Sequence, residues 1–464
     1  MASQLREIKE VSFGKSLKVI VDGFGFPNPF VRHYFLTHMH SDHTTGLRKT
    51  WNQGLIYCSE AAANLLRHDF GLVNHQLIRA LPLGETVVVT PSLKVTAISA
   101  NHSPDAVMFV FDFQDGCLEK RVVHTGDMRW TPGMATGILV EKPIDQLYLD
   151  NTYLKAKYTF PTQERVVIAI AEWMRQQLLA EPKTYFAFMT YHIGKERACF
   201  GAAEYLNMKV YVTPKKRRIL DLLNLPERWT RLMVRDPNAA SIRVGGRVNE
   251  DEVHEDAKKL GLRAGVVIRP TGWSYRKTGP LVSSRVSAHG IIVASAPYSE
   301  HSSYDEIRDC VRVLKPRRVI PTVGGAGDLL VEKELIGFMD LTGDKRRIDS
   351  YFTSRKAIKV SKEPQSVPGG KVSTKQQSVV DLTVSPSQGG QASVDMDGPK
   401  LEEEAKEEIF DLEQVDVAEQ RRILDEVVLR CKHQSNNGNQ QPGAGGGHAT
   451  RKRSIFDKLF RNAL

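Results

Sequence analysis

The residues best suited to chemistry lie in one histidine- and aspartate-rich segment, FLTHMHSDHTTGL at 35–47. His38, His40, Asp42 and His43 place four metal-ligand types within six positions. Alternate side chains of an extended run point the same way, so His38 and His40 face one side, and Asp42 and His43 follow at a turn. Two adjacent ligand pairs suit two neighbouring metal ions. Surface histidines in a polar loop are the alternative, which would explain one such residue better than four.

Further candidate ligands occur where other extended runs end. His102 lies between two such runs in SANHSPDAVMF, Asp127 follows a third in VVHTGDMRW, and Asp22 ends a fourth in VIVDGFG. Alone, each would be an ordinary turn aspartate or hydrogen-bonded histidine. Beside the dense cluster, they become candidate ligands, and a carboxylate at position 127 suits a bridge between two ions.

The elements that must position these residues are those of a compact α/β protein. Short β-branched runs between turn residues predict strands at 17–21, 34–36, 86–90, 107–113 and 121–124. Amphipathic stretches predict helices at 163–179 and 304–314. The sequence shows no internal repeat, which argues against a solenoid or a propeller.

Composition limits the function classes. The net charge of +10 on 464 residues divides into +12 over residues 1–360 and −2 over residues 361–464, so the basic part is the folded part. This distribution favours an acidic partner such as nucleic acid. Five scattered cysteines without a CxxC pair exclude a disulfide framework or zinc ribbon and favour a reducing compartment. The longest apolar stretch, at 166–174, is too short for a membrane span, so we expect no membrane association.

The C-terminal part is expected to be a tail. Residues 362–398 are rich in Ser, Gln, Gly and Pro, which predicts a disordered linker. Residues 415–431 predict an amphipathic helix that either packs on the core or binds a partner such as ubiquitin. The final segment, RKRSIFDKLFRNAL, is similar to a degenerate sliding-clamp box, with docking on its own core as the alternative. Its apolar anchors are Phe456, Leu459 and Phe460.

Together these motifs resemble the metallo-β-lactamase fold, in which Asp, H-x-H-x-D-H, His and Asp follow one another in this chain order. Further segments are similar to the β-CASP nucleases of DNA repair: YLDNTY (148–153), TYHIGKER (190–197), RPTGW (269–273), PYSEHSS (297–303) and LKPRRVIPTV (314–323). Among the Apollo, Artemis and interstrand-crosslink repair branches, FLTHMHSDHTTGL and YLDNT resemble the Apollo branch in particular. The resemblance covers residues 10–330 and leaves out the tail.

The resemblance implies an α/β fold, a metallo-β-lactamase αββα sandwich with an inserted β-CASP domain. We expect the sandwich in two parts, residues 1–152 and 291–357, around a β-CASP domain at 153–290. Residues 358–464 would form the largely disordered tail with short helices.

The resemblance also implies a ligand set. The expected ligands are His38, His40 and His102 for one ion, Asp42, His43 and His301 for the other, and Asp127 between them. Asp150 would orient a ligand, and Asp22 would fix the loop under the first histidine pair. Zinc is the expected metal and suits a histidine-rich set, but one ion, two ions or other divalent cations fit the pattern.

The implied activity is metal-dependent 5′-to-3′ exonuclease cleavage of DNA from a 5′ phosphate end. The ions would activate water and neutralise phosphate charge. The residues expected to be needed for catalysis are Asp42, His43, Asp127 and Asp150. We expect a monomeric nuclear protein acting on single-stranded DNA or on a duplex with a free 5′ end. Its role would be interstrand crosslink repair, double-strand break repair or telomere end processing.

Two alternatives remain at this point. An RNA-processing β-CASP nuclease is disfavoured by Val323, because the resemblance associates valine at this position with DNA and histidine with RNA. A small-molecule metallo-hydrolase is disfavoured by the motifs between 148 and 323 and by the basic core, since a compact active site needs no such insertion.

Substrate contacts are predicted from charge and from helix starts. A helix N-terminus with a lysine binds anions, so a 5′ phosphate pocket is expected from Lys195, Thr271, Ser302 and Ser303, with a solvated helix start as the alternative for Lys195. A basic run favours contact with the DNA backbone over a nuclear localisation signal or an exposed helix start. It comprises Lys215, Lys216, Arg217 and Arg218.

Two positions depart from the family pattern. NHSPDA at 101–106 has Asp105 where the family commonly has Gly, and Arg243 stands where it usually has His. Neither change removes a metal ligand, but they leave the shape of one loop and one substrate contact open.

Overall fold

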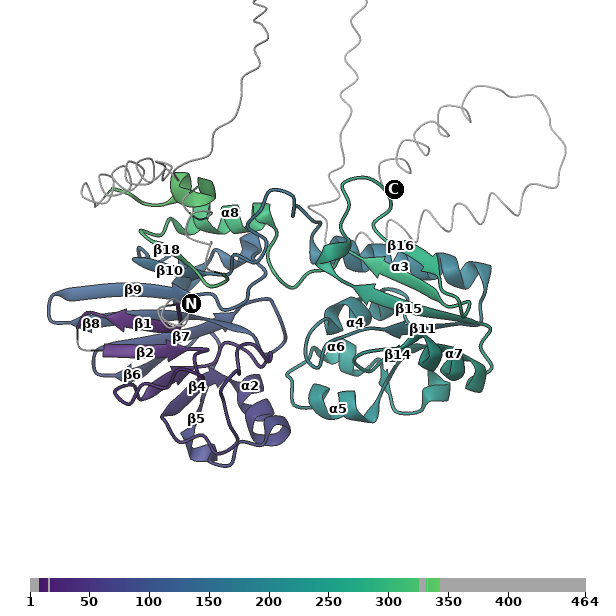
Figure 1. The fold of residues 1–464 in the computed structure, drawn as a ribbon, viewed down its shortest axis with the longest axis horizontal. Coiled ribbons are helices and arrows are strands. Elements are labelled where there is room, and N and C mark those ends of the chain that lie inside the picture. Colours follow the sequence, from purple (N-terminus) through teal and green to yellow (C-terminus); the bar gives the residue numbers. More distant parts are fainter. Residues whose placement is uncertain (1–7, 16, 325–330, 332, 343–464) are drawn as a thin grey trace, which may run out of the picture. The chain divides into compact units, whose positions relative to one another are not determined.

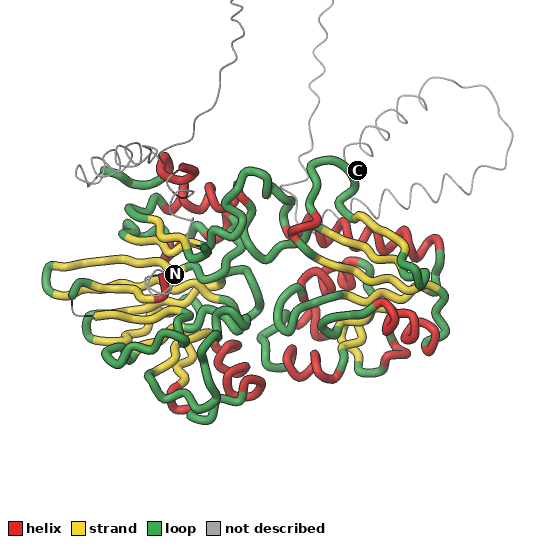
Figure 2. Tube along the Cα trace, in the orientation of Figure 1, coloured by secondary structure: helices red, strands yellow, loops and turns green. Residues whose placement is uncertain are grey.

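The computed structural model of the chain describes residues 8–15, 17–324, 331 and 333–342 (Figure 1). Within this part of the chain the backbone forms three sheets of five, six and seven strands. Figure 2 shows the helices and loops that connect them.

The first sheet has the strand order β1-β2-β3-β4-β5. Its strands are β1 (Glu10–Phe13), β2 (Leu17–Val21), β3 (His33–Phe35), β4 (Leu55–Ser59) and β5 (Ile78–Leu81). β1 and β2 are antiparallel, whereas β2, β3, β4 and β5 pair in parallel. Because β2 and β3 are parallel neighbours, Asp22 and residues 38–43 leave the sheet at the same edge.

The second sheet has the order β18-β10-β9-β8-β7-β6. Its strands are β6 (Thr86–Thr90), β7 (Leu93–Ser99), β8 (Val107–Asp115), β9 (Leu118–His124), β10 (Gln146–Leu149) and β18 (Val319–Pro321). β10 pairs in parallel with β9 and β18, and β7 runs in the direction of β9 because both are antiparallel to β8. The chain segments that follow β7, β9, β10 and β18 therefore start at one edge.

Strand β8 shows how these sheets are packed. Phe109, Phe111 and Phe113 point into an apolar layer shared with the first sheet, where the Phe35 and Phe109 rings lie 5.1 Å apart. Val110 points into the opposite layer. Successive side chains of a strand point to opposite faces of the sheet. Because both faces of β8 are buried, its sequence is a nearly continuous apolar run.

Helices cover the outer face of each sheet. α2 (Glu60–Leu65) packs on the first sheet, and α8 (Tyr304–Leu314) packs on the second. Helix α8 begins with a capping box between Ser303 and Glu306, and its buried residues recur at helical spacing. The helix–sheet–sheet–helix order confirms the predicted αββα sandwich.

The third sheet has the order β13-β12-β14-β11-β15-β17-β16. Its strands are β11 (Thr184–Phe188), β12 (Val210–Val212), β13 (Met233–Val234), β14 (Ile242–Val244), β15 (Ala264–Pro270), β16 (Ser283–Val286) and β17 (Ile292–Ala296). One face is covered by α3 (Gln163–Ala180), α4 (Glu196–Tyr205), α5 (Pro214–Leu220) and α6 (Glu227–Thr230). α7 (Glu250–Lys259) covers the other face.

Two sequence expectations can be compared with this fold. No helix of the described residues combines the length and apolar character that a bilayer crossing requires. Cys58, Cys117, Cys199 and Cys310 are free thiols, and all but Cys117 are buried.

Candidate metal centre

The predicted ligands converge around Asp127. Three groups of potential ligands share this carboxylate, and within each group the ligand atoms lie within 4.8 Å of one another. The groups are His38, His40, His102 and Asp127; Asp42, His43 and Asp127; and Asp127, Asp150 and His301. The fold thus brings together ligands that lie up to 263 residues apart in the chain, from His38 to His301, at one edge of the sandwich.

The two oxygens of Asp127 face different histidines. Its Oδ2 lies 3.8 Å from His38 Nε2, 3.7 Å from His102 Nε2 and 3.9 Å from His301 Nε2. Its Oδ1 lies 3.3 Å from His43 Nε2, which is also 3.5 Å from Asp42 Oδ2. A carboxylate whose two oxygens face different ligands can contact two neighbouring cations. This is the bridging role predicted for Asp127 from its place after a strand.

Backbone carbonyls fix two of the rings. His40 Nε2 donates to Ile193 O at 2.9 Å, and His102 Nδ1 donates to Glu300 O at 2.8 Å. The other nitrogens, His40 Nδ1 and His102 Nε2, lie 3.2 Å apart. Each ring is therefore held in the tautomer that presents a lone pair to the cluster, as metal-binding histidines require.

Carboxylates fix two further rings. His43 Nδ1 donates to Asp22 Oδ2 at 2.7 Å, and His301 Nδ1 donates to Asp150 Oδ2 at 2.8 Å. Asp22 also accepts from the backbone N–H of Thr37 at 2.8 Å and from its hydroxyl at 2.7 Å. This geometry agrees with the supporting roles expected for Asp22 and Asp150, and Asp150 additionally comes close enough to Asp127 and His301 to share a ligand group with them.

His38 has a different environment. It is fully buried, and its Nε2 is without a hydrogen-bond partner among the described residues. Its Nδ1 lies 3.0 Å from Thr37 Oγ1, which bonds to Asp22. Because buried polar atoms are normally paired, the orphaned nitrogen beside a carboxylate fits a metal ligand.

The charges in the cluster are strongly coupled. Burial opposes protonation of His43, yet Asp127 and Asp22 raise the pKa of this histidine well above its ordinary value. Burial would raise the pKa of Asp127, but His43 and His301 hold it well below its usual range. The carboxylates that hold a proton on His43 would also attract a metal cation.

Asp105, the departure from glycine, has a structural role. Its buried carboxylate accepts from the backbone N–H of Met39 and from Ser103 Oγ, both at 2.6 Å. Burial raises the pKa of Asp105. Since Met39 lies between His38 and His40, Asp105 ties the loop of His102 to the first histidine pair.

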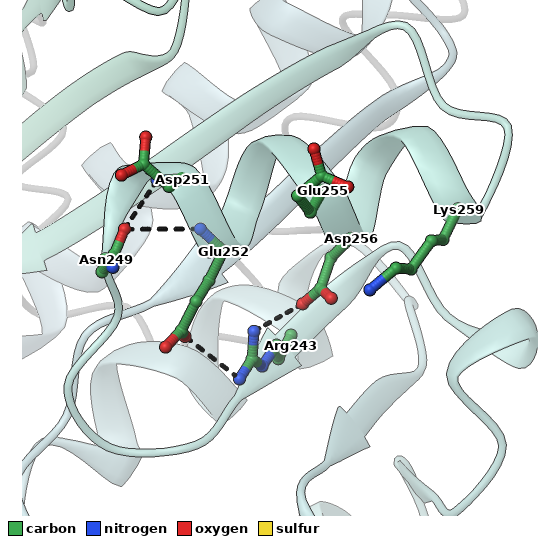
Figure 3. Close-up of a pocket in the computed structure, with 7 residues that line it drawn as sticks. All are labelled: Arg243, Asn249, Asp251, Glu252, Glu255, Asp256 and Lys259. Atoms are coloured by element: carbon green, nitrogen blue, oxygen red, sulfur yellow. Dashed lines mark hydrogen bonds and ion pairs between the residues drawn. The ribbon is translucent and has the colours of Figure 1, made fainter.

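Arg243, the other departure, contacts protein groups. Figure 3 shows it between two carboxylates of α7, with 2.5 Å to Asp256 Oδ2 and 3.6 Å to Glu252 Oε2. These residues line a surface pocket of about 430 Å³ together with Asn249, Asp251, Glu255 and Lys259. Arg243 therefore connects β14 to α7, and its charge is neutralised by α7.

The two serines predicted for the phosphate pocket bond to other parts of the protein. The buried Ser302 Oγ donates to Met128 O at 2.9 Å and accepts from Trp130 N–H at 2.8 Å. The buried Ser303 caps α8. Both hydroxyls are thus used by the protein, because the residues after His301 must start a helix.

Lys195 and Thr271 remain available at the predicted pocket. Lys195 is the N-cap of α4 with φ 67°, and its Nζ donates to Pro270 O at 2.6 Å. An ammonium has three donors, so this bond leaves others for an anion. Thr271 directly follows Pro270 and is half-buried.

The basic run divides along α5. Lys215 and Arg218 are exposed, and Arg217 forms an ion pair with Asp221 at 2.6 Å. Lys216 is buried, and its Nζ donates to Glu196 Oε1 at 2.6 Å and to the carbonyls of residues 191 and 192. The donors of Lys216 are therefore used inside the protein, whereas Lys215 and Arg218 are the members of the run that face solvent.

Val323 follows β18 and is 42% exposed, so it is not the buried strand-end valine that would need no functional explanation. Its backbone N–H donates to Asn151 Oδ1 at 2.8 Å, and Asn151 Nδ2 donates to its carbonyl at 3.0 Å. Since Asn151 adjoins Asp150, these two bonds tie the backbone of Val323 to the segment that carries Asp150.

Sequence reasoning missed two residues that support the site. The buried Arg129 donates to Ser299 O at 3.1 Å and His301 O at 3.4 Å. The buried Glu300 accepts from the backbone N–H of Lys195 at 2.5 Å, and burial raises its pKa to about 7. The segment PYSEHSS marked this region, but the partners of both charges are too distant in the chain to be read from it.

The tail predictions concern residues outside the described part of the chain. The predicted helix at 415–431 and the anchors Phe456, Leu459 and Phe460 all lie outside the described residues. The ubiquitin and sliding-clamp partners therefore stay predictions.

Comparison with known proteins agrees with this geometry. Residues 29–184 match the beta-lactamase superfamily domain, and residues 228–326 match the DNA repair metallo-beta-lactamase family. The DNA cross-link repair 1A protein of Homo sapiens is 35% identical over 301 residues, which cover 62% of this chain and 28% of that protein. The DNA cross-link repair protein SNM1 of Arabidopsis thaliana is 35% identical over 309 residues, covering 63% of this chain and 62% of that protein.

The 5′ exonuclease Apollo of Gallus gallus is 34% identical over 299 residues, which cover 63% of this chain and 59% of that protein. The chain thus matches between 28% and 62% of the length of these relatives. A metallo-β-lactamase fold implies a divalent metal, in agreement with the His/Asp cluster. The chain therefore carries a beta-lactamase superfamily domain and a DNA repair metallo-beta-lactamase domain, which confirms the resemblance predicted from its motifs.

Proposed function

We propose that this chain is a metal-dependent DNA exonuclease that hydrolyses phosphodiester bonds in the 5′-to-3′ direction from a 5′ phosphate end. The convergence of three ligand groups on Asp127 is the observation that carries the proposal. It is supported by relatives named as DNA cross-link repair proteins and as a 5′ exonuclease. We further propose a nuclear role in the repair of interstrand crosslinks or double-strand breaks, or in telomere end processing.

We propose zinc as the metal, because imidazole nitrogens with a shared carboxylate suit this ion. His38, His40 and His102 would hold one ion, and Asp42 and His43 would hold the other, with Asp127 between them. His301 is assigned to the second ion by the family resemblance, and its ring lies in a ligand group with Asp127 and Asp150. The bound ions would lower the pKa of water toward neutrality and neutralise charge on the phosphate oxygens.

The chain's own residues would position these ligands. Asp22 holds His43, and Asp150 holds His301, so each imidazole is oriented before the substrate arrives. Such preorganisation avoids rearranging the site during the reaction. We place Lys195 and Thr271 at the 5′ phosphate, since a lysine at a helix N-terminus favours an anion.

The proposal is tested with purified protein and single-stranded DNA that bears either a 5′ phosphate or a 5′ hydroxyl. The expected result is shortening from the 5′ phosphate end that a chelator abolishes and added zinc restores. The double variant Asp42→Ala/His43→Ala should be inactive. Digestion by this variant at the rate of the parent protein would refute the metal-site assignment.

Further arms separate the alternatives. RNA of the same sequence should be cut more slowly than DNA, and faster cutting of RNA would favour the RNA-processing alternative. Val323→His should lower the ratio of the cleavage rate on DNA to that on RNA, because it replaces the exposed valine associated with DNA substrates. Equal rates on 5′ phosphate and 5′ hydroxyl ends would remove only the phosphate pocket.

The predicted tail partners need a separate test. Deletion of residues 451–464 should abolish pull-down with a sliding clamp, while deletion of residues 415–431 should abolish pull-down with ubiquitin. Each deletion serves as the control for the other, and retained binding would dismiss the corresponding partner.

A further inference from the structure

Two aromatic side chains beside the metal-ligand cluster are exposed. Trp273 is 67% exposed and Tyr191 is 55% exposed. Large aromatic rings left in water forgo the stabilisation that burial would give them. Exposed aromatic rings at a reactive site are therefore candidates for ligand contacts.

Trp273 is held in place by two tyrosines. It lies in the short turn Gly272–Ser274 after β15, and its ring is 5.2 Å from the ring of Tyr153 and 5.6 Å from that of Tyr158. The Tyr153 ring is in turn 6.1 Å from the ring of His301. A single ring thus separates the exposed indole from a predicted metal ligand.

Tyr191 lies next to another ligand. Its ring is 6.3 Å from the ring of His40, and Lys195 Nζ lies 4.0 Å from the centroid of the tyrosine ring. Lys216 fixes the backbone by donating to Tyr191 O at 2.9 Å. Since Lys195 also donates to Pro270 O, it joins the segment of Tyr191 to the one that leads into Trp273.

Cations accompany both aromatic groups. Lys157 Nζ lies 4.9 Å from the centroid of the Tyr158 ring, and Lys195 Nζ lies 4.0 Å from that of the Tyr191 ring. Arg276 and Lys277, which follow Trp273, are exposed. Lysines for the phosphates, interleaved with rings for the bases, are the combination by which proteins hold single-stranded nucleic acid.

We propose that Trp273 and Tyr191 are stacking platforms for unpaired nucleobases of the DNA strand whose 5′ end enters the metal centre. This inference rests on the proposed nuclease function and adds how the strand is held. Stacking tolerates any base, because every base has a π face. The platforms would therefore bind the strand end without selecting a sequence, and a base-paired end would have to open before it could use them.

The test measures binding in chelator, so that no cleavage occurs. Fluorescence anisotropy is recorded with a labelled single-stranded oligonucleotide and with an analogue in which the terminal nucleotides are abasic. Trp273→Ala and Tyr191→Ala should each weaken binding of the normal oligonucleotide roughly 5- to 150-fold, the range of base–aromatic stacking. On the abasic analogue, each variant should bind as the parent protein does.

Matched variants guard against a folding defect. Trp273→Phe and Tyr191→Phe keep an aromatic ring and should retain most of the binding. Leu118→Ala changes a side chain that is 47% exposed at the opposite end of β9 from His124 and should bind as the parent does. Equal losses on normal and abasic strands, or no loss on either, would overturn the stacking proposal.

The nuclease assay keeps this failure distinct from failure of the proposed function. If the parent protein cuts DNA while the alanine variants bind and cut like the parent, only the stacking proposal falls. If the parent protein neither binds nor cuts DNA, the nuclease proposal falls, and the stacking proposal falls with it.

Discussion

The histidine cluster at 38–43 and the basic run at 215–218 each gather four functional side chains in a short stretch of sequence, but the fold treats them in opposite ways. His38 and His40 come from an extended segment and reach one cluster around Asp127. Lys215 and Lys216 come from helix α5, where one is exposed and the other buried. Alternate residues of an extended chain share a side, whereas successive residues of a helix point about 100° apart. Density therefore predicts a shared site only together with the local backbone period.

The largest expected effect breaks the cluster at its centre. Asp127→Ala removes the carboxylate common to all three ligand groups, so metal binding should fall together with DNA cleavage. Loss of metal catalysis corresponds to several kcal/mol, so the rate should drop at least about 10³-fold. Zinc content and initial rates are the measurements. A variant that retained both would show that the three groups do not act as one centre.

The next effect separates the two lysines of the basic run. Lys216→Ala leaves Glu196 buried without its cation, which should lower the free energy of unfolding by about 3 to 5 kcal/mol. Lys215→Ala, at an exposed position, should change it by less than about 0.5 kcal/mol. Denaturant unfolding of both variants measures the difference. Similar values would contradict the division of the run along the helix.

A smaller effect concerns the support behind the ligands. Asp22→Asn keeps the size of the side chain but weakens acceptance from His43 and Thr37, so metal affinity should fall about 10- to 100-fold. Competition with a coloured chelator gives the affinity. Asp221→Asn, which alters a more exposed carboxylate paired with Arg217, serves as the control and should leave the affinity unchanged.

The smallest effect concerns the helix start at Lys195. Lys195→Ala should reduce the advantage of a 5′ phosphate over a 5′ hydroxyl about tenfold, because one charge-assisted hydrogen bond is lost. Rates on a 5′ hydroxyl end should change little. A uniform loss on both substrates would assign Lys195 to general strand binding or to the loop of Glu300.

Much of the sandwich could be predicted, because its signals are local. The expected strands at 17–21 and 86–90 and the helix at 304–314 coincide with β2, β6 and α8. Their alternating or helical periods follow from the face that each element buries. The strand expected at 121–124 begins earlier, at Leu118, because β9 continues as an exposed hairpin arm whose polar residues carry no burial signal.

The candidate site was predictable for its ligands and not for its supports. His38, Asp127 and His301 follow recognisable motifs, and the fold brings them together. Arg129 and Glu300 gave no comparable signal, because their partners come from distant segments. The same limit applies to Ser302, whose bonds to residues 128 and 130 could not be predicted from the sequence around it. Contacts between remote segments are decided by packing and are invisible to local patterns.

The capping box of α8 has a consequence for local unfolding. Glu306 accepts from Ser303 N–H with one oxygen and from Arg129 with the other, while Arg129 reaches the carbonyl of His301. The loop that carries His301 is thereby fastened to the first helical turn, and it cannot swing away unless that turn frays. Native-state hydrogen exchange should show the amides of Ser302, Ser303 and Ile307 opening as one cooperative unit. The N-terminus of α8 then holds the imidazole of His301 in position relative to the other histidines of the cluster.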